Sequence, residues 1–278
     1  MTFKTVLSVI SVEHSDGDLR LAIDLSRQID AHLAVLVLSI AVPPPTSEYA
    51  AVMTEAWLQD RQAEIDRLHA RVKEVTAILA QSKLSADVDG EYVERGWTDD
   101  MVGRRSRYAD VTLIGPELNS DEDLKTMVLK GSLYESQIPV LLIPNAAGAT
   151  LLPKKVLLAW DGGPEATRAA REALPLLIGA DDVHLTMIDP RATEDGLNIE
   201  PGTDLAAYLA HHGAKVTIDQ LPSGGQPIVE TLRRHAIDMA ADMVVMGAYG
   251  HSRLRQRIFG GVTRSMIEEA DLPVFMAR

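Results

Sequence analysis

The sequence contains no cysteine, few aromatic residues and fewer basic than acidic residues. Without cysteine, disulfide bonds, thiolate catalysis and cysteine-ligated zinc or iron–sulfur clusters are excluded. The 27 Lys and Arg residues stand against 40 Asp and Glu residues, and the formal net charge is −13. Such a charge argues against binding to the phosphate backbone of nucleic acids. The sequence therefore predicts no nucleic-acid partner.

Long apolar runs are also missing, because none reaches the roughly 20 residues that a helix needs to cross a bilayer. The first residues, MTFKTVLSVISVEHSDGD, turn acidic too early for a secretory signal. We therefore expect a cytoplasmic protein with no membrane partner. The 278 residues exceed the common size of one domain, about 100–200 residues, and favour two compact domains.

What the sequence does contain is an internal repeat. The apolar run KTVLSVIS around Val6 corresponds to KVLLAWD around Val156, at an offset of 150 residues. Each run precedes an acidic turn, a stretch of helical periodicity (LRLAIDLSRQIDA or ATRAAREALPLLIGA) and a second apolar run, so both halves begin β-α-β. Later segments correspond at offsets of only 132–134 residues. The first half therefore carries an insertion, which we expect to be one long amphipathic helix from Thr46 to Gln81.

Apolar strands that alternate with helical crossovers predict a parallel sheet covered by helices on both faces. We expect two tandem, doubly wound α/β domains with five parallel strands each, at residues 1–146 and 153–278. The join lies near NAAGATLLPKK, which is rich in small residues. Two fused domains can pair within one chain, and the long helix offers a surface for a second chain, so a homodimer is a further expectation.

One segment of the second half has the character of an anion site. Doubly wound sheets bind ligands beyond the carboxyl ends of the strands where the winding reverses, here between strands that end near Asp161 and near Gly247. From Met243 to Ile267 there is no acidic residue, but there are four arginines: Arg253, Arg255, Arg257 and Arg264. Glycines let the backbone approach a ligand, and the amides of the following helix suit an anion. The segment predicts a polyphosphate site.

The spacing Gly247-x2-Gly250-x9-Gly260, after an apolar strand, resembles the nucleotide-binding signature of universal stress proteins, Gly-x2-Gly-x9-Gly-Ser/Thr. Asp161 matches that family's first-strand aspartate, and the Leu-Pro-Val of the last strand agrees as well. The resemblance covers nearly the whole chain as two copies. It implies an adenine nucleotide alpha hydrolase-like fold with strand order 3-2-1-4-5, pairing of two domains and, in one subclass, bound ATP.

The resemblance also implies roles for residues of the second half. Asp161 would face the ribose or a phosphate-bound metal, and Met187 would border the adenine through its backbone. Gly247 and Gly250 would line the ribose–phosphate turn, and His251 takes a position often held by arginine. The phosphates would be held by Gly260, Gly261, Val262 and Thr263.

Two departures from the family pattern affect these expectations. Gly261 stands where Ser or Thr is usual, so a hydroxyl is lost, and Thr263 is the candidate to compensate. In the first half, Ser11 replaces the aspartate, only Gly115 remains of the glycines, and the acidic residues Asp121, Glu122 and Asp123 lie where phosphates would sit. We expect the first domain to bind no nucleotide in this manner and to serve as a structural partner.

Structural explanations compete at every position. The glycines suit turns without a ligand, single arginines suit a solvated surface, and Asp161 suits the start of an Asp-Gly-Gly-Pro turn. His211 and His212 suit a polar helix end, because neighbours on a helix point about 100° apart.

The leading hypothesis is a stress-response regulatory protein that holds ATP (or AMP) with Mg2+ in its second domain. Little or no turnover is expected because no general base is evident beside the phosphates. The alternatives are a structural or interaction scaffold without nucleotide, and an enzyme acting on nucleotides, at most a slow ATPase.

Overall fold

The computed structural model describes residues 2–43, 55–190, 202–248 and 261–278, and the structural statements below concern these residues. Among them, no helix combines the length and the apolar character needed to cross a membrane. The chain divides into two compact units. The amino-terminal unit is Lys4–Ser136, and the carboxyl-terminal unit is Gln137–Arg278 together with the first three residues.

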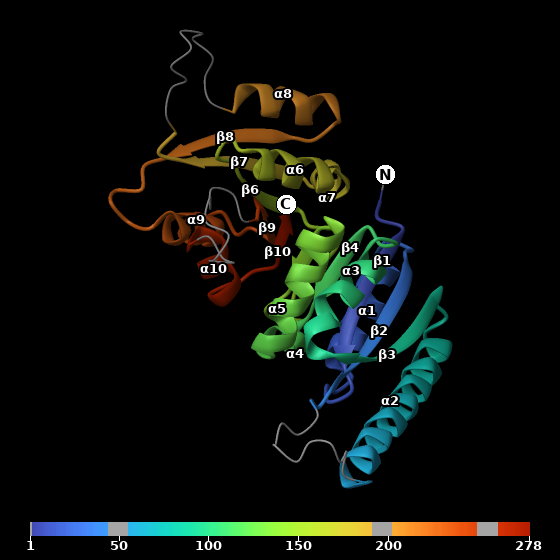
Figure 1. Cartoon of the computed structure of the whole chain (residues 1–278). Helices are drawn as coiled ribbons and strands as arrows, with labels where there is room; N and C mark the ends of the chain where they lie inside the picture. The colour runs from blue at the N-terminus through green and yellow to red at the C-terminus, as the bar shows by residue number, and fades with distance from the viewer. Residues whose placement is uncertain (1, 44–54, 191–201, 249–260) are drawn as a thin grey trace. The chain divides into compact units, whose positions relative to one another are not determined.

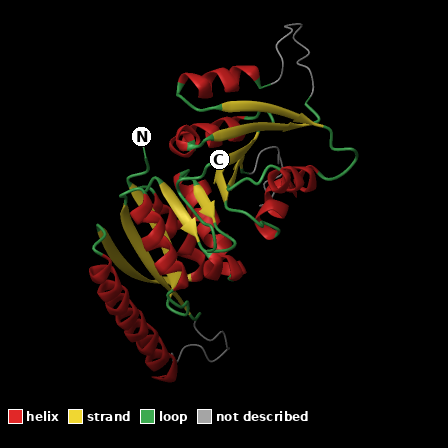
Figure 2. Ribbon diagram, turned by 180° about the vertical axis from the view of Figure 1, so that it is seen from behind, coloured by secondary structure: helices red, strands yellow, loops and turns green. Residues whose placement is uncertain are grey.

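The amino-terminal unit has a parallel sheet in the order β3-β2-β1-β4, with helices on both sides of the strands (Figures 1 and 2). Its regular elements, in chain order, are β1 (Thr5–Ser11), α1 (Gly17–Gln28), β2 (His32–Ala41), α2 (Glu55–Ser82), β3 (Ala86–Glu94), a 3-10 turn (Arg95–Trp97), α3 (Thr98–Ser106), β4 (Val111–Ile114), α4 (Pro116–Ser120), α5 (Glu122–Lys130) and a π-helical turn (Gly131–Ser136).

The carboxyl-terminal unit has its strands in the order β5-β10-β9-β6-β7-β8. All neighbours are parallel except β5 and β10, which pair antiparallel. Its elements are β5 (Val140–Leu142), β6 (Lys155–Ala159), α6 (Pro164–Glu172), α7 (Leu174–Gly179), β7 (Asp182–Ile188), α8 (Thr203–His211), β8 (Val216–Leu221), α9 (Ile228–Asp238), β9 (Met243–Gly247), α10 (Gly261–Glu268) and β10 (Val274–Ala277).

The predicted strand order is confirmed in the second repeat, because β8-β7-β6-β9-β10 is the order 3-2-1-4-5. Right-handed crossovers put the helices between β6 and β8 on one face and α9 and α10 on the other. The division between the units falls at Ser136, whereas the sequence places the end of the first repeat at residue 146. Residues 137–146 group with the second unit because β5 pairs with β10.

Two helices differ from the sequence-based expectation. The helical stretch after the first strand of the second repeat is divided into α6 and α7 at Ala173, since Pro175 in the first turn of α7 has no backbone N–H to donate. The long helix of the insertion is present as α2, Glu55–Ser82, and the expected portion from residue 46 to residue 54 lies outside the described residues.

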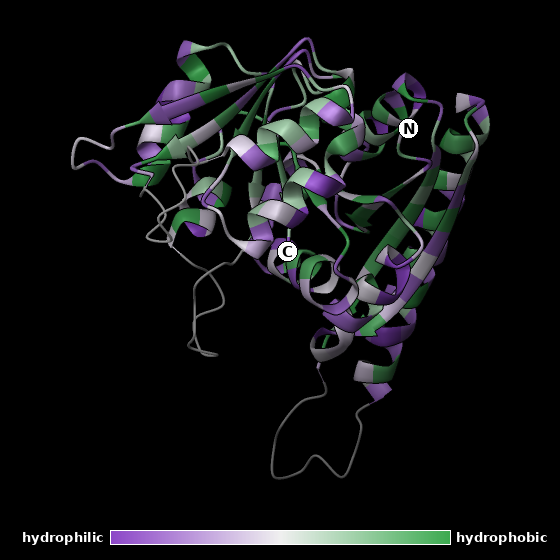
Figure 3. Cartoon of the chain, turned by 90° about the horizontal axis from the view of Figure 1, so that it is seen from above, coloured by the Kyte–Doolittle hydropathy of each residue, from purple (hydrophilic) through white to green (hydrophobic). Residues whose placement is uncertain are grey.

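The central strands form the core of each unit because most of their side chains are buried, whereas the outer strands β3 and β8 are largely exposed or half-buried. Val6 and Ile10 of β1 and Val156 and Leu158 of β6 have no exposed surface. Burying such a side chain contributes about 1.5–3 kcal/mol. The helices carry hydrophobic and hydrophilic residues on different faces, as Figure 3 shows. The long apolar strands of the sequence thus fold into central strands, as their near-continuous hydrophobicity predicts.

Candidate functional site

The carboxyl ends of β6, β7 and β9 share one edge of the sheet in the carboxyl-terminal unit (Figure 1). Strand β6 pairs in parallel with both β7 and β9, so the winding direction reverses between β6 and β9. Asp161 follows β6, Met187 is the penultimate residue of β7, and Gly247 ends β9. The fold therefore brings these three predicted residues to the edge where doubly wound sheets bind ligands.

Asp161 forms the turn that leads from β6 into α6. Its carboxylate accepts a hydrogen bond from the Gly163 amide at 2.8 Å, and Gly162 between them has a φ of +80°, which favours glycine. Pro164 then opens the helix at a position where a missing N–H costs nothing. The turn-forming role expected of an Asp-Gly-Gly-Pro sequence is thus present, and a role toward ribose or metal remains a prediction.

Gly247 lies where the end of β9 meets the first turn of α6. A Cβ atom at this position would lie 2.5 Å from the backbone nitrogen of Ala166 and 2.7 Å from the carbonyl carbon of Glu165. No side chain fits there without moving backbone, so close packing of strand and helix requires a glycine. This requirement holds without any ligand.

Met187 and the first turn of α10 complete the described part of the predicted site. Met187 is buried, and its methyl group packs where Gly202, with a φ of +84°, precedes α8. Gly261 and Val262 are exposed, whereas Thr263 is buried. Among the described residues, a Cβ at Gly261 would meet no atom within 4 Å, so none of them fills the space beside the first amides of α10.

Part of the predicted site lies outside the described residues. This holds for the predicted ligand-binding residues Gly250, His251 and Gly260 and for the arginines Arg253, Arg255 and Arg257. The remaining arginine of the segment, Arg264, pairs with an acid of its own helix, since its Nε lies 2.7 Å from a carboxylate oxygen of Glu268.

In the amino-terminal unit, the corresponding edge of the sheet holds a buried carboxylate of the protein itself. Asp18 of α1 is buried, and its two oxygens accept the amides of Glu117, at 3.1 Å, and Leu118, at 2.9 Å, in the first turn of α4. Any Cβ at Gly115 would overlap this carboxylate. Burial raises the pKa of Asp18, although the two amide hydrogen bonds oppose the shift. Backbone amides after the fourth strand thus bind an anion, and here that anion is a side chain of the protein.

The acidic residues that follow β4 are used within the fold. Asp121 accepts the Leu124 amide at 3.0 Å as the N-cap of α5. The next two acids form ion pairs at 2.6 Å, Glu122 with Lys125 and Asp123 with Arg95. Together with Asp18, these contacts support the expectation that the first unit does not hold phosphates in this manner.

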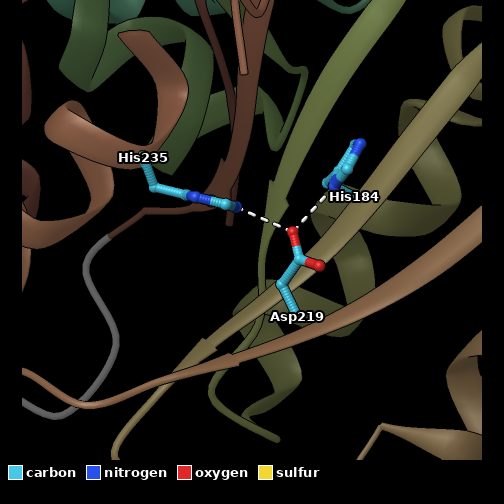
Figure 4. Close-up of side chains that lie close together, drawn as sticks. All are labelled: His184, Asp219 and His235. Atoms are coloured by element: carbon cyan, nitrogen blue, oxygen red, sulfur yellow. Dashed lines mark hydrogen bonds and ion pairs between the residues drawn. The ribbon is translucent and has the colours of Figure 1, made fainter. Parts of the chain in front are cut away.

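One cluster of titratable side chains was not predicted from the sequence, and it is formed by His184 of β7, Asp219 of β8 and His235 of α9 (Figure 4). Both imidazoles lie 2.7 Å from the same Asp219 oxygen, and all three side chains are about four-fifths buried. Burial lowers the pKa of His184, but hydrogen bonds to Asp219 and Asp182 outweigh it and raise the pKa above 6.5. No local sequence motif contains these three residues, so the sequence gives no signal of the cluster.

The adjacent histidines His211 and His212, which suit a polar helix end, are exposed. The His212 ring packs against Tyr208.

Comparison with known proteins finds a family match in the second half of the chain. The model of the universal stress protein family matches residues 153–278. The carboxyl-terminal part of the chain is therefore similar to the universal stress protein family. The predicted resemblance is thereby confirmed, and the matched residues are those of the second predicted domain.

Similar proteins extend the comparison. A segment of 129 residues is 26% identical to "Universal stress protein Slr1230" of a Synechocystis strain, covering 45% of this chain and 42% of that relative. The chain therefore matches less than half the length of this curated relative.

Two solved structures show the fold across both units. A universal stress protein from Archaeoglobus fulgidus superposes with a TM-score of 0.66 at 14% identity, covering 98% of this chain and 96% of that one. A protein of unknown function from Pseudomonas aeruginosa gives 0.60 at 13% identity, covering 99% and 92%.

Proposed function

We propose that this chain is a universal stress protein, a regulatory protein of the stress response whose carboxyl-terminal unit binds ATP (or AMP) with Mg2+ and turns it over slowly or not at all. A cytoplasmic location and a homodimer belong to the same proposal. The observation that carries it is the contrast between the two repeats. In the amino-terminal unit, amides after the fourth strand bind the carboxylate of Asp18. In the second repeat, the corresponding segment from Met243 to Ile267 contains arginines and no acid.

The described residues fit a phosphate group at this edge. The first turn of α10 is exposed, and no described residue has an atom within 4 Å of the Gly261 Cβ position. The positive end of the helix dipole favours an anion there. Asp161 supplies a carboxylate at the end of the neighbouring strand, the type of ligand that Mg2+ accepts beside phosphates. ATP would contribute the charged phosphates and an apolar adenine. The protein contributes orientation and amide donors.

Thermal unfolding with and without ATP and Mg2+ tests this proposal, and isothermal titration gives the affinity. A ligand at 100 times its Kd adds about 2.7 kcal/mol to the free energy of unfolding. Gly261→Asp is the informative variant, because it places a carboxylate beside the proposed phosphates without a steric clash. Gly261→Ala is the matched control, because it changes the backbone in the same way without adding charge.

We expect wild type and Gly261→Ala to bind and Gly261→Asp to lose binding. An acid in the first turn favours helix formation, so loss of binding would not come from an unfolded α10. If wild type shows no stabilisation at millimolar ATP, the nucleotide proposal fails.

The scaffold hypothesis would then take its place. It has its own support, since close packing alone accounts for Gly247 and Glu268 already pairs with Arg264. Light scattering of the purified chain tests the homodimer separately, because a monomer at micromolar concentration would remove that part of the proposal in either case.

A further inference from the structure

A cluster of two imidazoles and a carboxylate lies away from the predicted nucleotide residues, between the edge of the sheet and α9. His184 and Asp219 project from the neighbouring strands β7 and β8, and His235 reaches them from the last turn of α9 (Figure 4). The odd-numbered neighbours of His184 are core residues: Leu185 and Met187 face Gly202 at the start of α8. His184 therefore points to the opposite face of the sheet, where α9 contacts β7.

A neutral His184 cannot donate to both of its carboxylate neighbours, so a proton or a metal ion must occupy one of its two nitrogens. The Nδ1 atom of His184 lies 2.7 Å from Asp219, and its Nε2 atom lies 2.9 Å from Asp182. A neutral imidazole has only one N–H to donate, whereas an ionised carboxylate only accepts. The same Asp219 oxygen also faces Nε2 of His235 at 2.7 Å. Two carboxylates thus surround two imidazoles, and a divalent cation between the imidazoles would balance the two negative charges.

We propose that Nδ1 of His184, Oδ2 of Asp219 and Nε2 of His235 bind one Zn2+ ion, with an open fourth position for water or a ligand. Two imidazole nitrogens and one carboxylate oxygen form a donor set that suits Zn2+, whereas Mg2+ and Ca2+ prefer oxygen ligands. The three donor atoms lie within 4.8 Å of one another. Ligand atoms about 2.0–2.2 Å from a tetrahedral Zn2+ are roughly 3.3 Å apart, so small side-chain rotations open the 2.7 Å contacts enough for the ion.

Asp182 is the positioning residue of this site. Its carboxylate holds Nε2 of His184 at 2.9 Å and so turns Nδ1 toward Asp219. Carboxylates that bind the second nitrogen of a ligating histidine fix the orientation of the ring and raise its basicity. This contact distinguishes the cluster from a chance meeting of surface histidines. The site goes beyond the proposed nucleotide function, because none of its residues belongs to the predicted nucleotide site.

The test is a Zn2+ titration of the untagged full chain against a chromogenic chelator, with Co2+ as a spectroscopic substitute. The main variants are His235→Gln and Asp219→Asn, and His211→Gln is the matched control because His211 is an exposed histidine outside the cluster. Asp182→Asn tests the positioning role. Far-UV circular dichroism checks that each variant is folded.

We expect one tightly bound Zn2+ per wild-type chain, the visible absorption of tetrahedral Co2+, and loss of both in His235→Gln and Asp219→Asn. Asp182→Asn should weaken binding by about 10–100-fold, and His211→Gln should bind as the wild type does. The proposal is overturned if the wild type shows no saturable Zn2+ binding, if Co2+ gives only an octahedral spectrum, or if a folded His235→Gln variant retains the ion. An equal effect of His211→Gln would also overturn it.

Discussion

Replacing Asp18 with alanine should destabilise the amino-terminal unit, because this carboxylate binds two amides in the first turn of α4. Asp18 is 4% exposed and Leu118 is fully buried, so water does not readily replace the lost acceptor. Each buried donor left without a partner costs about 1–3 kcal/mol. Removing a buried carboxylate, whose pKa burial raises, offsets part of this cost. The expected net loss is about 2–4 kcal/mol.

The assay is urea unfolding followed by tryptophan fluorescence in a Trp160→Phe background. Trp57 and Trp97 belong to the amino-terminal unit, so the remaining signal reports on that unit. The complementary Trp57→Phe, Trp97→Phe background leaves Trp160 to report on the carboxyl-terminal unit. Separate signals are needed because a chain with two units need not unfold in a two-state manner.

Asp24→Ala is the matched control, because this exposed aspartate of the same helix forms only a surface pair with Arg27. It should change the free energy of unfolding by no more than about 0.5 kcal/mol. The reasoning about Asp18 is refuted if Asp18→Ala behaves like this control, or if it shifts only the signal of Trp160.

The pH dependence of the free energy of unfolding gives a second test of the Asp18 carboxylate. Because its folded-state pKa is raised above 3.8, the charged form is the less favourable one in the folded unit. The contribution of Asp18 to stability is therefore greatest below pH 3.8 and falls as the pH rises through the folded-state pKa. Asp18→Asn should lack this pH dependence, so the difference in the free energy of unfolding between wild type and Asp18→Asn should change with pH in this range.

Two further predictions concern tyrosine ionisation and glycine packing. Burial and a hydrogen bond to Glu64 raise the pKa of Tyr92 from 10.0 to about 12, so its stabilising contribution is present below pH 10 and is lost as the pH rises to about 12. An ultraviolet titration should lose its latest step in Tyr92→Phe, and an unchanged titration would contradict the assignment. Gly247→Ala should cost about 1–3 kcal/mol through overlap with the Ala166 backbone, whereas Gly261→Ala should stay within about 0.5 kcal/mol. Equal melting temperatures of the two variants would show that the close approach is not restrictive.

The fold could be predicted because its signals are local and repeated. Strands β1 and β6 are apolar runs at equivalent places of two copies, and the turn signals after them stand close by in the sequence. A parallel sheet with short connections then leaves few possible topologies. The break at Ala173 was missed, because the apolar periodicity continues through Pro175 while the backbone hydrogen bonds do not.

The chemistry of the sites was harder to predict because its partners are distant in the sequence. Asp18 is an ordinary acid in the first turn of a helix, and only the fold brings it to amides about 100 residues away. His184, Asp219 and His235 are separated by 35 and 16 residues, and they meet only because β7 lies beside β8 and under α9. The sequence places Gly247 at the end of a strand, as the structure does. The spacing of the glycines does not reveal that close packing against α6 also requires a glycine there.

The antiparallel pairing of β5 with β10 has a consequence for anyone who expresses the second domain alone. A fragment that begins at residue 153, where the family match starts, lacks Val140–Leu142, so β10 becomes an exposed edge strand. Four buried residues, Val274 to Ala277, would then offer unpaired amides and carbonyls to other molecules. A fragment that starts at Gln137 retains the covering strand and should stay dispersed where the shorter one self-associates.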